Sequence, residues 1–130
     1  MGPSIRRVFT GAPWEKKVGY CRAVRAGNHV YVSGTAPVAP DGSTHAPGDA
    51  YAQATRCAEI ALGAMRELGA SAEHVVRTRM YVTDIARWAE YGRAHAEAFG
   101  AAPPATAMVE VKSLIAPDML IELEVDAVVE

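Results

Sequence analysis

The segment from Pro103 to Val111 reads PPATAMVEV and presents one hydroxyl group, that of Thr106, where two prolines meet an alternating strand. Prolines restrict the backbone, so a segment of this kind can form the rim of a binding site. A threonine hydroxyl at a rim offers a ligand one neutral hydrogen bond. The same pattern is also the ordinary start of a strand, and this segment alone does not separate the two interpretations.

Charged residues form a second group with an ordered spacing. Arg77 and Arg79 alternate along one predicted strand, and Glu122, Glu124 and Asp126 alternate along the last one. Opposite charges on adjacent strands can pair, and a symmetric assembly could cover such a face, so we interpret it as an oligomer interface. The alternative is a solvated face with incidental ion pairs, since antiparallel sheets often keep one wet face.

Several other chemistries find no support in the motifs. The four histidines show no H-x-H or H-x-x-x-H spacing and there is no C-x-x-C, so we expect no metal site. No G-x-G-x-x-G and no P-loop motif occurs, which argues against dinucleotide and P-loop nucleotide sites. A cytosolic chain with a full-sized core has little use for a disulfide, so we expect Cys21 and Cys57 to be free thiols.

The elements that must position these residues follow from periodicity and turn residues. Strands are predicted at 5–9, 19–26, 29–33, 75–83, 108–112 and 119–129. One helix is predicted from Asp49 to a cap at Gly69, and a second from an N-cap at Asp84 to about Phe99. The order β-β-β-α-β-α-β-β, with helices long enough to cover one sheet face, predicts a two-layer α+β domain.

Alternation along three of these elements predicts which side chains are buried. The first helix should bury one face of small and apolar residues, namely Ala54, Cys57, Ala58, Ala61, Met65 and Leu68. On the strand at 75–83, one face should carry Val76, Thr78, Met80 and Val82 and the other Arg77, Arg79 and Tyr81. On the last strand the apolar face should carry Ile121, Leu123, Val125 and Ala127.

Composition sets the remaining limits. A chain of 130 residues with 50% hydrophobic composition has the size of one domain, which we place at 1–130. Its 13 basic and 15 acidic side chains give a net charge of −2, which disfavours binding to nucleic acid. No apolar run reaches the length of a membrane span, and the N-terminal stretch MGPSIRRVF lacks the apolar core of a signal peptide. We therefore expect a soluble, cytoplasmic protein.

Three segments together carry a family resemblance. GYCRAVRAGNHVYVSGTAPV at 19–38, VVRTRMYVTDIARWAEY at 75–91 and PPATAMVEVKSLIAPDMLIELEVDAVV at 103–129 resemble the Rid family, the reactive intermediate deaminases also called the YjgF family. The specific features are the GN turn followed by VSGT, the step from Val82 to Trp88, and the closing P-A-x-x-x-V-E-V.

The resemblance implies a fold, an assembly and an activity. It implies a chorismate-mutase-like two-layer α+β sandwich, with a mixed sheet and two helices on one face. It also implies a homotrimer with a central β-barrel and a small-molecule ligand in each cleft between subunits. In the deaminase branch these clefts hydrolyse enamines and imines such as 2-aminoacrylate to a keto acid and ammonia, without a metal or organic cofactor.

The chain departs from the family at position 106. Members with established deaminase chemistry read P-A-R where this chain reads P-A-T, and that arginine grips the substrate carboxylate through a bidentate pair. A threonine should weaken carboxylate binding from this position by a few kcal/mol, roughly the loss of two charged hydrogen bonds. Another basic residue could take the place of the arginine as the carboxylate-binding group, or the basic residues that could do so are merely solvent-facing charges. These candidates are Arg22, Arg25, Lys16 and Lys17.

The resemblance also implies roles for five other residues, each with a plainer alternative. Glu122 falls where the family has the acidic residue that positions the hydrolytic water, or it only pairs with an arginine. Tyr20 would line the cleft or be an exposed aromatic, and Ser33 and Gly34 would lie by the ligand or form an ordinary turn. His95 stands where deaminases tend to have tyrosine, and a lone helical histidine is more often structural.

Two functional hypotheses follow. The first is a Rid-type hydrolase of a reactive imine, enamine or related small molecule, with specificity altered because Thr106 replaces the arginine. The alternative is a non-catalytic small-molecule-binding trimer that has lost deaminase activity. Some family members have been described as ribonucleases, and the charge balance of this chain disfavours that activity.

Overall fold

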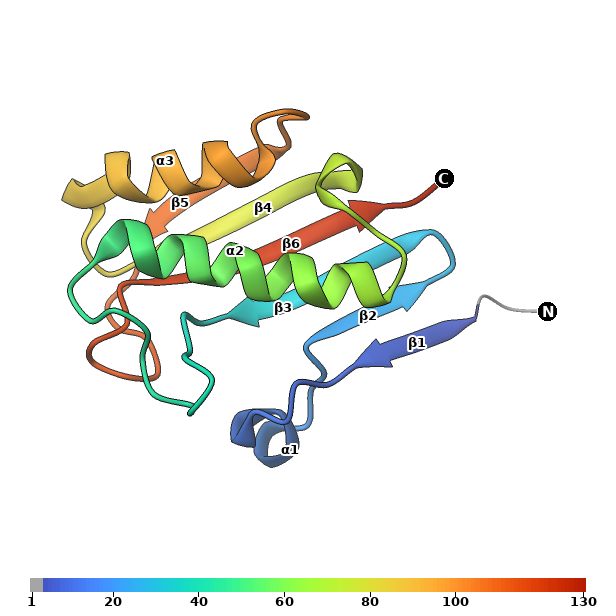
Figure 1. Ribbon diagram of the computed structural model, residues 1–130, viewed down its shortest axis with the longest axis horizontal. Coiled ribbons are helices and arrows are strands. Elements are labelled where there is room, and N and C mark those ends of the chain that lie inside the picture. The colour runs from blue at the N-terminus through green and yellow to red at the C-terminus, as the bar shows by residue number, and fades with distance from the viewer. Residues whose placement is uncertain (1–3) are drawn as a thin grey trace.

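A computed structural model describes residues 4–130 (Figure 1). Residues 1–3 lie outside the described part. They belong to the N-terminal stretch in which the sequence predicts no signal peptide. The elements are β1 (Ile5–Val8), α1 (Pro13–Val18), β2 (Ala23–Ala26), β3 (His29–Thr35), α2 (Ala50–Glu67), β4 (Val75–Val82), α3 (Trp88–Phe99), β5 (Ala105–Glu110) and β6 (Ile121–Val128).

All six strands form one sheet in the order β1-β2-β3-β6-β4-β5. The pair β4–β5 is parallel and the other neighbouring pairs are antiparallel, so the sheet is mixed. Helices α2 and α3 lie side by side on one face of it, while α1 stands beyond one end of the sheet (Figure 1). The predicted α+β architecture with two helices on one face is therefore confirmed.

Helix α2 forms the largest part of the helical layer. The Asp49 side chain caps its start by accepting a hydrogen bond of 2.9 Å from the backbone N–H of Ala52. Gly69, with a φ of 81° that favours glycine, follows its end. Every predicted core position of this helix is buried, and most of those side chains are alanine or cysteine. Small side chains let the helix approach the sheet closely, which fixes the position of β6 beneath it.

Strand β6 divides the core from the uncovered sheet face. Its apolar residues are buried and alternate with half-buried Glu122, Glu124 and Asp126. On this face Arg79 Nη1 lies 3.3 Å from an Asp126 oxygen and 3.9 Å from a Glu124 oxygen, and the Tyr81 hydroxyl donates to Glu124 over 2.6 Å. The predicted pairing of opposite charges across adjacent strands is therefore present.

The predicted buried face of β4 was wrong at its first residue. Val76 was expected to share the buried face with Thr78, but its side chain is 49% exposed and Val75 is buried instead. The pairing of β4 with β6 shifts between Val75 and Arg77, which is the mark of a β-bulge. The extra residue reverses the alternation at this point, so a strict period of two fails there.

Other elements also differ from the prediction, and three of these differences lie near the candidate residues or concern a whole element. Helix α1 was not predicted, because six residues are too few to show a helical period. The strand expected from Gly19 begins only at Ala23, and the strand expected from Met108 begins at Ala105. The start of this last strand at Ala105 places the candidate residue Thr106 inside β5.

Candidate functional site

The structure gathers the candidate site residues into two groups. We name the first the Glu122 wall, and it consists of Tyr20, Arg22, Ser33, Gly34 and Glu122. We name the second the Thr106 wall, and it consists of Thr78, His95 and Thr106.

The carboxyl group of Glu122 is lodged against Gly34. A Cβ atom at position 34 would lie 2.9 Å from both Cδ and Oε1 of Glu122, a distance that side chains do not tolerate. A side chain at position 34 would therefore push the carboxyl group, which is the flexible end of Glu122, out of this place. Burial raises the pKa of Glu122, and the nearby charge of Arg22 partly opposes that rise. A carboxyl group tuned in this way exchanges protons nearer to neutral pH than an exposed one.

The end of β3 and the segment before β2 hold the rest of the Glu122 wall. The Ser33 hydroxyl donates to the backbone oxygen of Cys21 over 2.8 Å, and the Ser33 backbone N–H donates to the oxygen of Arg22 over 2.9 Å. These bonds fix the segment that carries Tyr20 and Arg22, whose guanidinium lies 5.4 Å from the centre of the Tyr20 ring. The predicted residues Tyr20, Ser33 and Gly34 therefore lie in one region with Glu122.

The Thr106 wall is a chain of hydrogen bonds across β5, β4 and α3. The Thr78 hydroxyl donates to the Thr106 hydroxyl over 2.7 Å, and the same Thr78 oxygen lies 2.7 Å from His95 Nε2. Because Thr78 donates its only hydroxyl proton to Thr106, its oxygen accepts the hydrogen bond from the Nε2–H of His95. Thr106 then keeps its own proton free to donate outward from the exposed edge strand.

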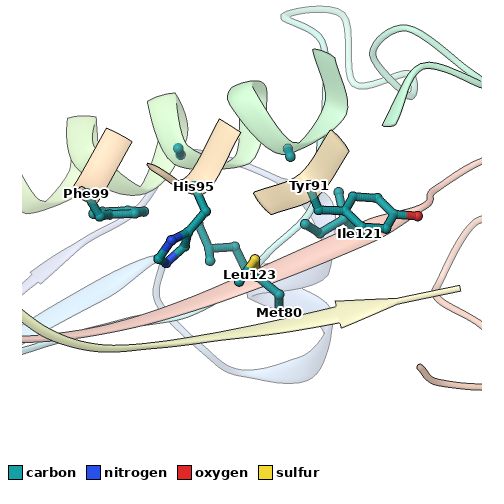
Figure 2. A pocket seen from close by; sticks show the side chains of 8 residues that line it. Met80, Tyr91, His95, Phe99, Ile121 and Leu123 are labelled. Carbon is teal, nitrogen blue, oxygen red and sulfur yellow. The ribbon is translucent and has the colours of Figure 1, made fainter. Parts of the chain in front are cut away.

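His95 is held as a neutral ring within the helical layer. Burial lowers the pKa of its imidazole, and the ring of Phe99 packs against it with the centroids 5.0 Å apart. Figure 2 shows His95 reaching from α3 toward the sheet, between Phe99 and Tyr91 of the same helix, with Met80 and Leu123 on the sheet side. The cavity they line is about 10 Å³, which is room for about one water molecule and not for a substrate.

One chain does not bring the two walls into a single cleft. Glu122 alternates with buried residues of β6 and so points to the uncovered sheet face. Thr106 shares a hydrogen bond with buried Thr78, under α3, on the other face. Thr106 itself is exposed at the sheet edge, where β5 has a neighbouring strand only on the β4 side.

Of the four alternative cations, only Arg22 belongs to a wall. Arg25 donates to the backbone oxygens of Gly27 and Leu68 and is used by the hairpin. Lys16 and Lys17 are exposed on α1, along an open hollow of about 720 Å³. Arg22 is only 7% exposed, so the expectation that it faces solvent was wrong.

Thr78 is a further candidate site residue that the sequence did not point to. The sequence places it on the buried face of β4, and the structure confirms that it is fully buried. A polar side chain on an apolar face needs a hydrogen-bonding partner, and this was the signal that could have identified it. Its partners Thr106 and His95 could not be read from the sequence, since they come from two other elements.

The remaining reactive groups offer no second site. Cys21 and Cys57 are both free, as predicted, and burial raises the pKa of the Cys57 thiol so that it stays protonated. Across residues 4–130, no three His, Cys, Asp or Glu side chains lie close enough to share a metal ion. None of the helices in this same range is long and apolar enough to cross a membrane.

Comparison with known proteins identifies the family. The family model described as endoribonuclease L-PSP matches residues 11–129. An uncharacterized protein of Streptomyces coelicolor is 36% identical, over 95% of this chain and 92% of that protein. A 3-aminoacrylate deaminase of Acinetobacter baylyi is 33% identical, over 80% of this chain and 82% of that protein.

A solved structure gives the same result for the fold. A crystal structure from Mycobacterium tuberculosis, described as a member of the highly conserved YjgF/YER057c/UK114 family, matches with a TM-score of 0.87 and 46% identity. The match covers 97% of this chain and 100% of that chain. The chain therefore belongs to the endoribonuclease L-PSP or YjgF family, and the resemblance to Rid proteins is confirmed.

Proposed function

We propose that this chain is a hydrolase of a reactive imine, enamine or related small molecule. The observation that carries the proposal is the carboxyl group of Glu122, lodged against Gly34 with its pKa raised by burial. The relative from Acinetobacter baylyi supports it, because 3-aminoacrylate, the substrate in its name, is an enamine. The cytoplasmic location expected from the sequence stays a prediction.

The proposed active form is a homotrimer around a central β-barrel. In it, the uncovered sheet faces of three copies meet, and the Glu122 wall of one copy lies opposite the Thr106 wall of the next. Two observations support this arrangement. The uncovered face carries an ordered set of charges, and the two walls of one chain point to opposite sides of the sheet.

Hydrolysis then follows from the position and protonation of Glu122. The carboxylate accepts a proton from a water molecule as the water oxygen forms a bond to the carbon of a protonated imine, and the electron pair of the C=N double bond moves to nitrogen to give a neutral carbinolamine. Glu122 then returns the proton to the nitrogen. The C–N bond breaks to release ammonia while the carbinolamine hydroxyl gives its proton to water and becomes the carbonyl group. A raised pKa suits a group that must both accept and return this proton.

Thr106 sets the specificity of the cleft in this proposal. It accepts a hydrogen bond from Thr78 and can donate one to an acceptor on the ligand, but it brings no charge. The substrates accepted should therefore differ from those of relatives with an arginine here.

The alternative is a trimer that binds a small molecule in the cleft without chemistry. The neutral Thr106 favours it, because the family's carboxylate-binding group is missing from that wall. Measuring both hydrolysis and ligand binding distinguishes the two functions directly.

The test is a panel of imines mixed with the purified protein. The panel contains 2-aminoacrylate and 2-iminobutanoate, generated by a dehydratase, and an uncharged imine, and release of the carbonyl product is followed. We expect faster hydrolysis of at least one imine, and its loss in Glu122→Gln. Glu59→Gln, which neutralises an exposed carboxylate on α2, is the control and should keep full activity.

A second variant tests the role of position 106. Thr106→Arg should gain 2-iminobutanoate hydrolysis relative to the uncharged imine, because it restores a bidentate cation at the exposed rim. If no imine is hydrolysed faster than in buffer while a small ligand still binds, the non-catalytic function is the correct one.

A further inference from the structure

Arg22 is a buried cation whose hydrogen-bonding capacity is not used up within residues 4–130. Its side chain is 7% exposed, and its Nε and Nη2 atoms are enclosed yet have no hydrogen-bond partner among residues 4–130. Arginine cannot give up its charge at any ordinary pH, so burial does not neutralise it. A buried charge with unpaired N–H groups is costly unless acceptors from outside the chain satisfy them.

The neighbours of Arg22 do not supply those acceptors. Glu122 lies near enough for the Arg22 charge to oppose the rise of its pKa, but no salt bridge within 4.0 Å joins the two in the described chain. Tyr20 offers its ring face at 5.4 Å, which stabilises the cation without accepting its N–H groups. The backbone of Arg22 is bonded to Val8 and Ser33, so the residue is held in place.

These observations together describe an anion-binding position. A guanidinium with free N–H groups recognises a planar carboxylate through two parallel hydrogen bonds. Here it is held in the same wall as Glu122, the residue that our proposed function assigns to the reacting water. A carboxylate bound to Arg22 would place the adjoining carbon of a 2-imino acid close to that water.

We propose that Arg22 binds the carboxylate of a small 2-imino or 2-keto acid in this site. The Glu122 wall then supplies the cation that the Thr106 wall lacks. The ligand is still an anion, but its carboxylate binds on the Glu122 side of the cleft. This inference rests on the proposed function for its choice of ligand. Its test uses binding instead of turnover, so the two can fail separately.

The probes are 2-oxobutanoate and its uncharged analogue 2-oxobutanamide, with affinity measured by calorimetry on the full chain. We expect wild type to bind the acid more tightly than the amide. Arg22→Gln should weaken binding of the acid by roughly 10- to 100-fold and leave the amide unchanged, because one charged pair is lost. Arg66→Gln removes an exposed arginine from α2 and should bind both probes like wild type.

Two further measurements guard against a folding defect in Arg22→Gln. One is the affinity of the Arg22→Lys variant for the acid, and the other is an NMR signal of Arg22 in the wild-type protein. The lysine variant keeps the charge without the two-pronged geometry, so its affinity for the acid should lie between those of wild type and Arg22→Gln. In wild type, the Nε–H signal of Arg22 in nitrogen-15 NMR should move in a saturable way with 2-oxobutanoate and not with 2-oxobutanamide.

Three results would overturn the inference. The first is equal affinity of wild type for the two probes, and the second is an Arg22 signal that ignores the acid. The third is an Arg22→Gln protein that binds the acid normally but no longer assembles, which would show that a carboxylate of a neighbouring copy satisfies Arg22. A protein that binds the acid through Arg22 but hydrolyses no imine would contradict only the proposed function.

Discussion

Glu122 is a residue whose burial works against folding and raises the pKa of its carboxyl group, a change that suits the hydrolysis we propose. Its pKa is raised in the folded chain, mainly by burial, so the folded state holds the proton at a pH where the unfolded chain has released it. Stability from this group is complete below the unfolded pKa of about 4.3 and is lost as the pH rises through the higher folded value. A charged Glu122 therefore destabilises the protein at neutral pH.

Removing the charge should reverse this effect. We predict that Glu122→Gln is more stable than wild type at pH 7 to 8, and that the difference shrinks as the pH falls toward about 4, near the unfolded pKa. Urea unfolding at fixed protein concentration across this range measures it. Glu59→Gln, at an exposed position, should show no such trend. A Glu122→Gln protein that is no more stable at pH 7 would mean that burial does not penalise the carboxylate.

Sequence reasoning identified most of the wall residues but not their partners. Glu122, Gly34 and Thr106 were selected by resemblance at their positions in the chain. The contact that gives Gly34 its role, a space filled by the Glu122 carboxyl group, joins β3 to β6 and depends on strand register. Register follows from the assembled sheet and its bulges, which local periodicity does not contain.

At the scale of elements, Thr78 ties α3 to both β4 and β5. Its hydroxyl is the shared member of two hydrogen bonds, one to Thr106 and one to His95. We predict that Thr78→Val lowers the free energy of unfolding by roughly 1–3 kcal/mol, because the Nε2–H of half-buried His95 then loses its acceptor, Thr78 Oγ1. Valine nearly matches threonine in shape, so the loss reports the hydroxyl group and not a cavity.

Thr78→Ser is the matched variant, since it keeps the hydroxyl and removes one methyl group. Its free energy of unfolding should lie closer to wild type than that of Thr78→Val in urea titrations. Equal losses in the two variants would assign the effect to packing. In that case the hydrogen-bond chain would not orient the Thr106 hydroxyl.

The elements also show where periodicity succeeds and where it fails. Helix α2 and strand β6 are long and keep one period throughout, so both were predicted with their buried faces. Helix α1 has only six residues, too few to show a period, so it was not predicted. The bulge at Val76 changes the phase of β4, which only its pairing with β6 reveals.

At the scale of the molecule, we propose that each wall is only half of a site. Within residues 4–130, Glu122 lies on the uncovered sheet face with a raised pKa, and Thr106 lies on an exposed edge strand with its hydroxyl free to donate. A closed symmetric assembly repeats both walls around an axis, so each copy can complete the next. The charged sheet face between Arg79 and Asp126 is where we propose that the copies meet.

A shared site makes a prediction that no single-chain site can satisfy. Glu122→Gln should inactivate one wall, and Thr106→Trp should block the other by filling the rim with a bulky ring. After the two inactive proteins are unfolded together and refolded as a mixture, some clefts receive a normal wall from each parent. Random assembly of equal amounts leaves about one cleft in four with both walls intact, so about a quarter of wild-type activity should return.

The control replaces one parent by the double variant Glu122→Gln/Thr106→Trp. Mixed with Glu122→Gln, it cannot form a cleft with a normal Glu122, so this mixture should stay inactive after the same treatment. Activity is followed with the imine that wild type hydrolyses fastest, and light scattering checks that the refolded species are trimers. If the first mixture is as inactive as its parents although mixed trimers form, Glu122 and Thr106 act within one chain, and the two walls described here do not face each other across a subunit boundary.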